Sequence, residues 1–130
     1  MKRQSTLITI WALLIIVMIL HFNYHIGEIF YGIDIELKDA SGTVPIRTHV
    51  IRNIFYHLPI IWILTLVYFS SKAFKLTLFL VSLVYTFAHT MHLVKDMADA
   101  NFSQTPLLTL ALLLSIILNI EQFLYWKKGE

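Results

Sequence analysis

Apolar residues occur along the chain in four long runs, separated by short polar links. The runs cover residues 6–29, 52–71, 74–95 and 105–126. Each is close to the ~20 predominantly apolar residues that an α-helix needs to cross the hydrocarbon core of a bilayer. None shows the alternation of a barrel strand, and a helix satisfies its own backbone groups in lipid. The pattern predicts an all-α integral membrane protein: a single domain over residues 1–130, with four transmembrane helices in a bundle and no β domain.

Composition strengthens this prediction and narrows the class of partner. The chain has 130 residues, of which 58% are hydrophobic and 14% charged, and it has no cysteine. Soluble domains are about 45–50% apolar and about 25% charged. The absence of cysteine excludes disulfides and thiolate metal sites. A net charge of +2 is too small to indicate nucleic acid binding, so the expected partner is the lipid bilayer.

The distribution of basic residues predicts the orientation. Cytoplasmic ends and loops of membrane proteins carry an excess of lysine and arginine. If the N-terminus is inside, six basic residues lie on the cytoplasmic side: Lys2, Arg3, Lys72, Lys75, Lys127 and Lys128. Four lie on the opposite side: Lys38, Arg47, Arg52 and Lys95. We therefore expect a multi-pass protein of the cell (inner or plasma) membrane, N-in and C-in, with both termini cytoplasmic.

The histidines all fall in the outer half of this predicted bundle. His21, His25 and Glu28 have spacing i, i+4 and i+7, so they share one face of the first helix. A second stripe on the third helix has spacing i, i+3, i+7 and i+10 and consists of His89, His92, Asp96 and Asp99. With a rise of about 1.5 Å per residue, His21, His57 and His89 each lie ~6–7 Å outward of the midplane.

Ionisable groups inside a membrane are costly and usually mark function. Imidazole together with carboxylate suits a transition metal ion such as zinc, iron or copper. The stripes therefore predict a metal site that serves redox chemistry, metal handling or metal-assisted chemistry. The predicted ligands are His21, His25, His89 and His92, with His57, Glu28 and Asp96 as further or supporting groups.

Other uses of the same residues stay open at this point. A haem b with His21 and His89 as axial ligands is one alternative. A proton relay or quinone site that uses Tyr24, histidine and Glu28 is another. A third is a non-enzymatic accessory or assembly subunit of a larger membrane complex, or a homo-oligomer, in which histidines only make interhelical hydrogen bonds. The sequence does not decide whether the protein is an enzyme.

Two further positions disturb the apolar pattern. Pro59 removes an amide from the hydrogen-bond ladder of the second helix, and we expect a kink there. Glu121 lies in the inner half of the fourth span. We expect its carboxylate either to reach the interface or to pair with Thr65, Tyr68 or Ser82, unless it carries protons or contacts another subunit.

Overall fold

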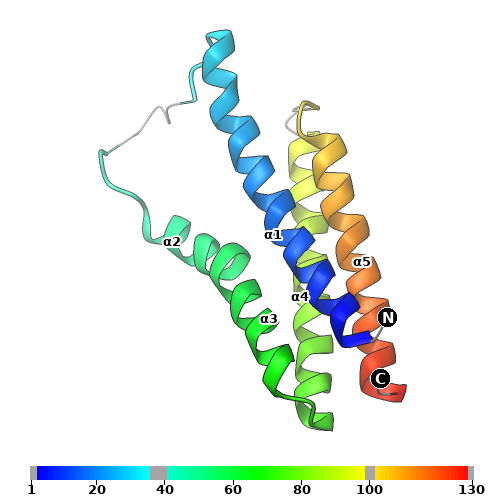
Figure 1. Ribbon diagram of the computed structural model, residues 1–130. Coiled ribbons are helices and arrows are strands. Elements are labelled where there is room, and N and C mark those ends of the chain that lie inside the picture. Colours follow the sequence, from blue (N-terminus) through cyan, green and yellow to red (C-terminus); the bar gives the residue numbers. More distant parts are fainter. Residues whose placement is uncertain (1–2, 36–40, 99–101, 129–130) are drawn as a thin grey trace.

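The computed structural model describes residues 3–35, 41–98 and 102–128, and all regular structure in these ranges is helical (Figure 1). This confirms the predicted all-α class. The elements are α1 (Arg3–Gly27), a 3₁₀ turn η1 (Glu28–Tyr31), α2 (Ile46–Arg52), a π-helical turn η2 (Asn53–His57), α3 (Leu58–Tyr68), α4 (Lys72–Ala98) and α5 (Thr105–Lys128).

Four helical segments are long and apolar enough to cross a membrane: Arg3–Tyr31, Ile46–Tyr68, Lys72–Ala98 and Thr105–Lys128. They correspond in order to the four predicted spans. The second begins at Ile46 rather than at residue 52, because Pro45 has an extended backbone with ψ 145° and the helix starts directly after it. The segment Ile46–Tyr68 is made of α2, η2 and α3 in succession.

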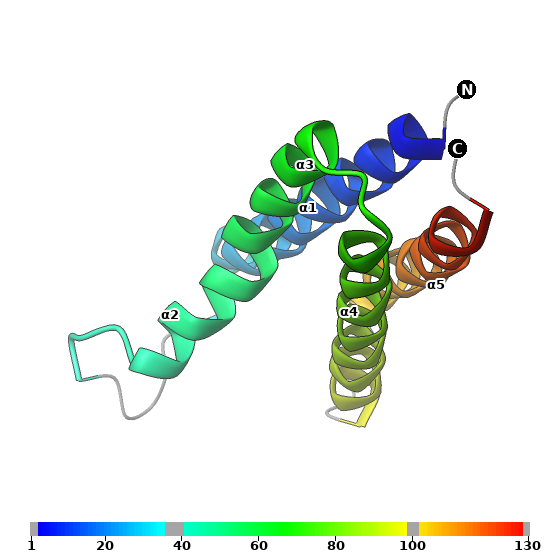
Figure 2. The same cartoon turned by 90° about the horizontal axis from the view of Figure 1, so that it is seen from below.

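The helices pack side by side in the order α3, α1, α5, α4. Figure 2 shows the bundle from one end, with α2 lying away from α4 and α5. Both termini are at the same end of the bundle (Figure 1). The link between α4 and α5 is therefore at the end opposite the termini, close to the last turns of α1.

Large side chains from α1 and α4 meet in the middle of the bundle. Leu7, Trp11 and Leu14 of α1 are buried together with Leu78 and Tyr85 of α4. The rings of Trp11 and Tyr85 meet edge to face with centroids 5.0 Å apart. Aromatic pairs of this kind add about 0.5–1.5 kcal/mol beyond the burial of their area.

The contact between α4 and α5 is polar and uses small side chains. Asn119 donates to Thr86 Oγ1 at 2.7 Å, and the Thr86 hydroxyl lies 3.2 Å from the Ser115 carbonyl. Ser82 and Ser115 are fully buried at this contact. Small and hydroxyl side chains let two backbones approach closely in a membrane, which explains why α4 packs on α5.

The disturbance expected at Pro59 takes the form of the π turn. The Leu58 amide donates to the Asn53 carbonyl, five residues back, so it is not available to the Ile54 carbonyl as in an α-helix. The next amide in the π register belongs to residue 59, and proline has none. The hydroxyl of Tyr85 donates to the Ile54 carbonyl instead. A side chain of α4 thus supplies the hydrogen bond that Pro59 cannot donate.

Glu121 does not pair with any of the three groups expected from the sequence. Its Oε2 lies 3.2 Å from Arg3 Nε, and the Arg3 guanidinium also reaches the Leu124 carbonyl at 3.5 Å. The expected pairing was wrong because α5 packs on α1, which brings the cationic start of α1 within reach. Ser82 instead donates to the Phe79 carbonyl at 2.7 Å.

Candidate functional site

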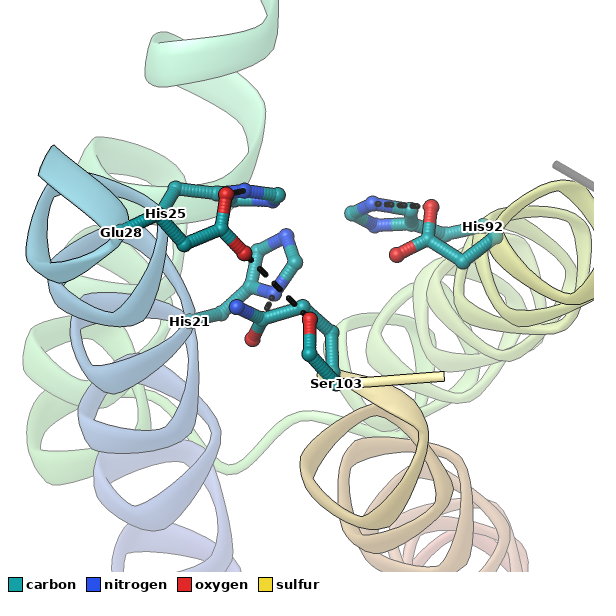
Figure 3. Close-up of polar contacts among 7 residues, drawn as sticks. His21, His25, Glu28, His92 and Ser103 are labelled. Atoms are coloured by element: carbon teal, nitrogen blue, oxygen red, sulfur yellow. Dashed lines mark hydrogen bonds and ion pairs between the residues drawn. The ribbon is translucent and has the colours of Figure 1, made fainter. Parts of the chain in front are cut away.

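The two predicted histidine stripes face each other at the half of the bundle away from the termini. His21 meets His25 with ring centroids 4.6 Å apart, and His21 meets His92 at 4.8 Å. Both contacts are edge to face, with interplanar angles of 77° and 86°. We call His21, His25 and His92 the histidine cluster, and Figure 3 shows its three rings pointing toward one another from α1 and α4.

His21 is at the buried centre of the cluster. Its side chain is only 6% exposed, and its Nδ1 lies 3.2 Å from Oε1 of Gln104, which is 1% exposed. Because an amide oxygen only accepts, His21 Nδ1 carries the proton in this contact. The lone pair of the neutral imidazole is then on Nε2, which is the form that binds a metal ion.

Each of the other two histidines lies beside a carboxylate of its own chain segment. His25 Nδ1 is 3.9 Å from Glu28 Oε2, and His92 Nε2 is 3.7 Å from Asp96 Oδ1. Ser103 donates to Glu28 Oε1 at 3.3 Å (Figure 3). This bond ties η1 to the residues just before α5. Glu28 and Asp96 therefore stand where the sequence placed them, next to histidine.

His89 lies apart from these ring contacts, in an aromatic niche. Its ring centroid is 5.4 Å from that of Phe55 and 6.5 Å from that of Tyr85, and its side chain is 1% exposed. Within the described part of the chain, His89 Nδ1 has no hydrogen-bond partner, and the buried Oδ2 of Asp96 has none either. Two buried polar atoms next to the cluster are thus left unsatisfied, which is costly unless a further group binds there.

The structure does not bring His57 to the cluster. The side chain is exposed, and its Nδ1 lies 2.6 Å from Asn53 Oδ1. Its place in the π turn directs it to another part of the surface. Asp99, the outermost member of the predicted stripe on α4, lies outside the described residues.

The cluster as it stands is not arranged around a metal ion. Among the residues that the structure describes, no group of three or more His, Asp or Glu side chains is positioned to hold one. The predicted shell of His21, His25, His89 and His92 is therefore not assembled in this arrangement, and the metal site stays a prediction.

Sequence reasoning missed the residues that surround the histidines. Gln104 and Ser103 belong to the link before α5, where no helical periodicity signals a buried position. Phe55 was not among the residues that the sequence assigned to the site. The one local signal is that Gln104 and Thr105 directly precede Pro106, so that Gln104 is held at the start of a helix.

No protein-family model matches the chain, and no curated protein or solved structure shows significant similarity to it.

Proposed function

We propose that the chain is an integral membrane protein with both termini on the cytoplasmic side. Its four apolar helices support insertion. Their exposed side chains are apolar in mid-span, as a lipid-facing surface requires: Leu13, Ile16, Leu64, Val84, Leu113 and Ile117. The two termini share one end of the bundle (Figure 1).

The basic residues support the orientation. In the described ranges, the end that holds the termini carries Arg3, Lys72, Lys75, Lys127 and Lys128. The opposite end carries Arg47, Arg52 and Lys95. The sequence also assigned Lys2 to the cytoplasmic side and Lys38 to the opposite side, and both lie outside the described residues. The bias agrees with the rule that cytoplasmic segments are richer in lysine and arginine.

We further propose that the histidine cluster binds a transition metal ion, with His21, His25 and His92 as ligands. The observation that carries this proposal is the spacing of the His21 ring from each of the other two rings. Two imidazoles on one tetrahedral ion have centroids about 5 Å apart, because each Zn–N bond is about 2 Å long. The observed 4.6 and 4.8 Å are close to that spacing. Rotation of the rings about their side-chain torsions is then the main change that binding requires.

The surroundings of the cluster suit such an ion. Glu28 and Asp96 stand beside His25 and His92, where they can orient a ring or neutralise charge. Gln104 holds His21 in the tautomer with the lone pair on Nε2. The unsatisfied His89 Nδ1 and Asp96 Oδ2 are further polar atoms that a hydrated cation would satisfy. Zinc, iron and copper all accept this donor set.

The haem alternative with His21 and His89 as axial ligands is less well supported. A porphyrin would have to lie between the two rings. The His21 ring is in contact with His25 and His92, and the His89 ring with Phe55, so these contacts would have to open.

The accessory-subunit alternative is supported by a different observation. His21, His25 and His92 each have a polar neighbour in the chain, in Gln104, Glu28 and Asp96. The cluster could then join α1 to the start of α5 through the His21–Gln104 hydrogen bond, and to α4 through the ring contact of His21 with His92, without an ion.

Metal analysis of the purified protein separates these functions. We would measure bound zinc, iron and copper, and the visible spectrum after cobalt(II) addition, for the wild type and for His25→Ala/His92→Ala. The matched control is His49→Ala/His57→Ala, since both of these histidines are exposed and outside the cluster. We expect stoichiometric metal in the wild type and in the control, and its loss in the cluster variant.

Other results would contradict the proposal. Equal metal content in both double variants would place the ion elsewhere. A folded wild type that takes up no added metal would favour the accessory subunit. A Soret band would indicate haem.

A further inference from the structure

A groove opens on the outside of the second span, separate from the histidine cluster. It has a volume of about 470 Å³ and is lined by Phe22, Thr48, Ile51, Arg52, Tyr56 and His57. We call it the π-turn groove. One wall is the apolar side of α1 at Phe22, and the other runs along α2 and η2. Phe22 and Ile51 are 50% and 43% exposed, so the groove has an accessible apolar surface.

The π turn explains why Arg52 and His57 line the same groove. In an α-helix, residues five apart point about 140° away from each other, because successive residues turn by about 100°. The turn Asn53–His57 has wider hydrogen bonding, with the Leu58 amide bonded to the Asn53 carbonyl. The extra residue in that turn brings His57 round toward Arg52. Such turns often occur at functional sites.

The polar part of the groove is suited to an anion. Among the residues that the structure describes, its lining includes Arg52 and His57 but no carboxylate. Asn53 Oδ1 accepts from His57 Nδ1 at 2.6 Å, which fixes the direction of that ring. The Tyr56 hydroxyl is occupied, since it donates to the Met18 carbonyl at 3.3 Å, so Tyr56 adds mainly its apolar ring to the wall.

We propose that the π-turn groove binds an anionic phospholipid of the surrounding bilayer. The phosphate lies at Arg52, and an acyl chain lies along Phe22 and Ile51. Arginine binds phosphate with two parallel hydrogen bonds. Arg52 is near the start of the apolar segment Ile46–Tyr68, which is the depth of lipid headgroups. The inference rests on the proposed membrane insertion, but not on metal binding.

Lipid retention tests this site in the full chain. The protein would be placed in nanodiscs of phosphatidylcholine with a minor fraction of phosphatidylglycerol, then extracted in mild detergent, and its retained lipids would be quantified by mass spectrometry. We expect phosphatidylglycerol to be enriched over its share of the nanodisc. Arg52→Gln should lower that enrichment about five-fold, the factor that corresponds to about 1 kcal/mol for one basic side chain near an anionic lipid surface.

Two further variants make the test specific. Arg47→Gln removes an exposed charge from the same helix outside the groove, so it should leave the enrichment unchanged. Ile51→Trp fills the groove while keeping Arg52, so it should abolish the enrichment. Arg52 and Ile51 are both exposed, and their substitution leaves the helix packing in place.

Four outcomes would overturn the inference. Equal losses in Arg52→Gln and Arg47→Gln would mean general charge attraction. Unchanged retention in Ile51→Trp would mean that the lipid lies elsewhere. A free long-chain fatty acid can be supplied together with phosphatidylglycerol. If the protein retains the fatty acid in preference, the occupant is not a membrane phospholipid. A chain that fails to enter nanodiscs would contradict membrane insertion, and this inference with it.

Discussion

The imidazole ring of His21 stands edge-on to that of His92, with centroids 4.8 Å apart, although the two residues belong to the first and third apolar spans. Further toward the termini, Trp11 and Tyr85 repeat this ring-to-ring contact between the same two helices. The backbone of α1 packs on α3 and α5, and that of α4 packs on α5. Between α1 and α4 the contact is made by large rings. The histidine cluster is therefore part of the packing as well as a candidate binding site.

Gln104 is expected to hold the cluster together. Gln104→Ala leaves the buried Nδ1–H of His21 without its acceptor, and an unsatisfied buried donor costs about 1–3 kcal/mol. Unfolding of the detergent-solubilised protein, followed by circular dichroism, measures this change. Asn23→Ala, at an exposed position of α1, is the control and should change the free energy of unfolding by less than about 0.5 kcal/mol. Equal effects would show that the bond between Gln104 and His21 contributes nothing.

Tyr85 and Pro59 should be energetically coupled. Tyr85→Phe removes the hydroxyl that donates to the Ile54 carbonyl, and we expect a loss of about 1–3 kcal/mol of stability. Pro59→Ala restores a backbone N–H in the same turn, which can donate to that carbonyl. Tyr85→Phe should therefore cost less in the Pro59→Ala background than in the wild type. A double-mutant cycle measures the difference, and strict additivity would contradict this account of the π turn.

The orientation can be tested because the chain has no natural cysteine. Ser41→Cys lies in the link after η1, and Ser70→Cys lies in the link between α3 and α4; both positions are exposed. In intact cells, a membrane-impermeant maleimide should label only Ser41→Cys. Ser70→Cys should react after the membrane is permeabilised. The opposite pattern would mean that both termini face away from the cytoplasm.

The ion pair of Arg3 and Glu121 should contribute modestly to stability. Their side chains are 24% and 26% exposed, so solvent screens part of the attraction. We expect a coupling of about 0.5–1 kcal/mol in a cycle of Arg3→Ala and Glu121→Ala. Raising the salt concentration should reduce this coupling, because the pair is near the end of the bundle. A coupling that is absent at low salt would contradict the pairing.

The apolar pattern was sufficient to predict the number and kind of the elements. Each run is long enough to cross a bilayer as a helix, and a helix needs no partner strand to satisfy its backbone. Local spacing also placed His25 beside Glu28, and His92 beside Asp96, because residues three or four apart on a helix are neighbours. Helix boundaries were less well predicted, since the second span starts after Pro45 within a polar stretch.

Predictions that needed more than one helix were only partly successful. The sequence placed His89 and His92 on one stripe, but in the structure they have different partners, with His89 against Phe55 and His92 against His21. The rotation of α4 about its axis decides this, and that rotation depends on how the rings of α1 and η2 pack.

The sequence by itself determined four apolar helices, the polar stripes on two of them, and the absence of thiol chemistry, because these follow from residue type and spacing along one helix. Only the tertiary structure decided that His21, His25 and His92 meet, that Gln104 orients His21, that Arg3 pairs with Glu121, and that the π turn brings His57 to Arg52. The physical reason is that such contacts join separate helices or depend on a local change of helix register. The contacts between helices and the helix register both depend on which side chains fill the space between helices. The periodicity of a single segment does not indicate which side chains these are.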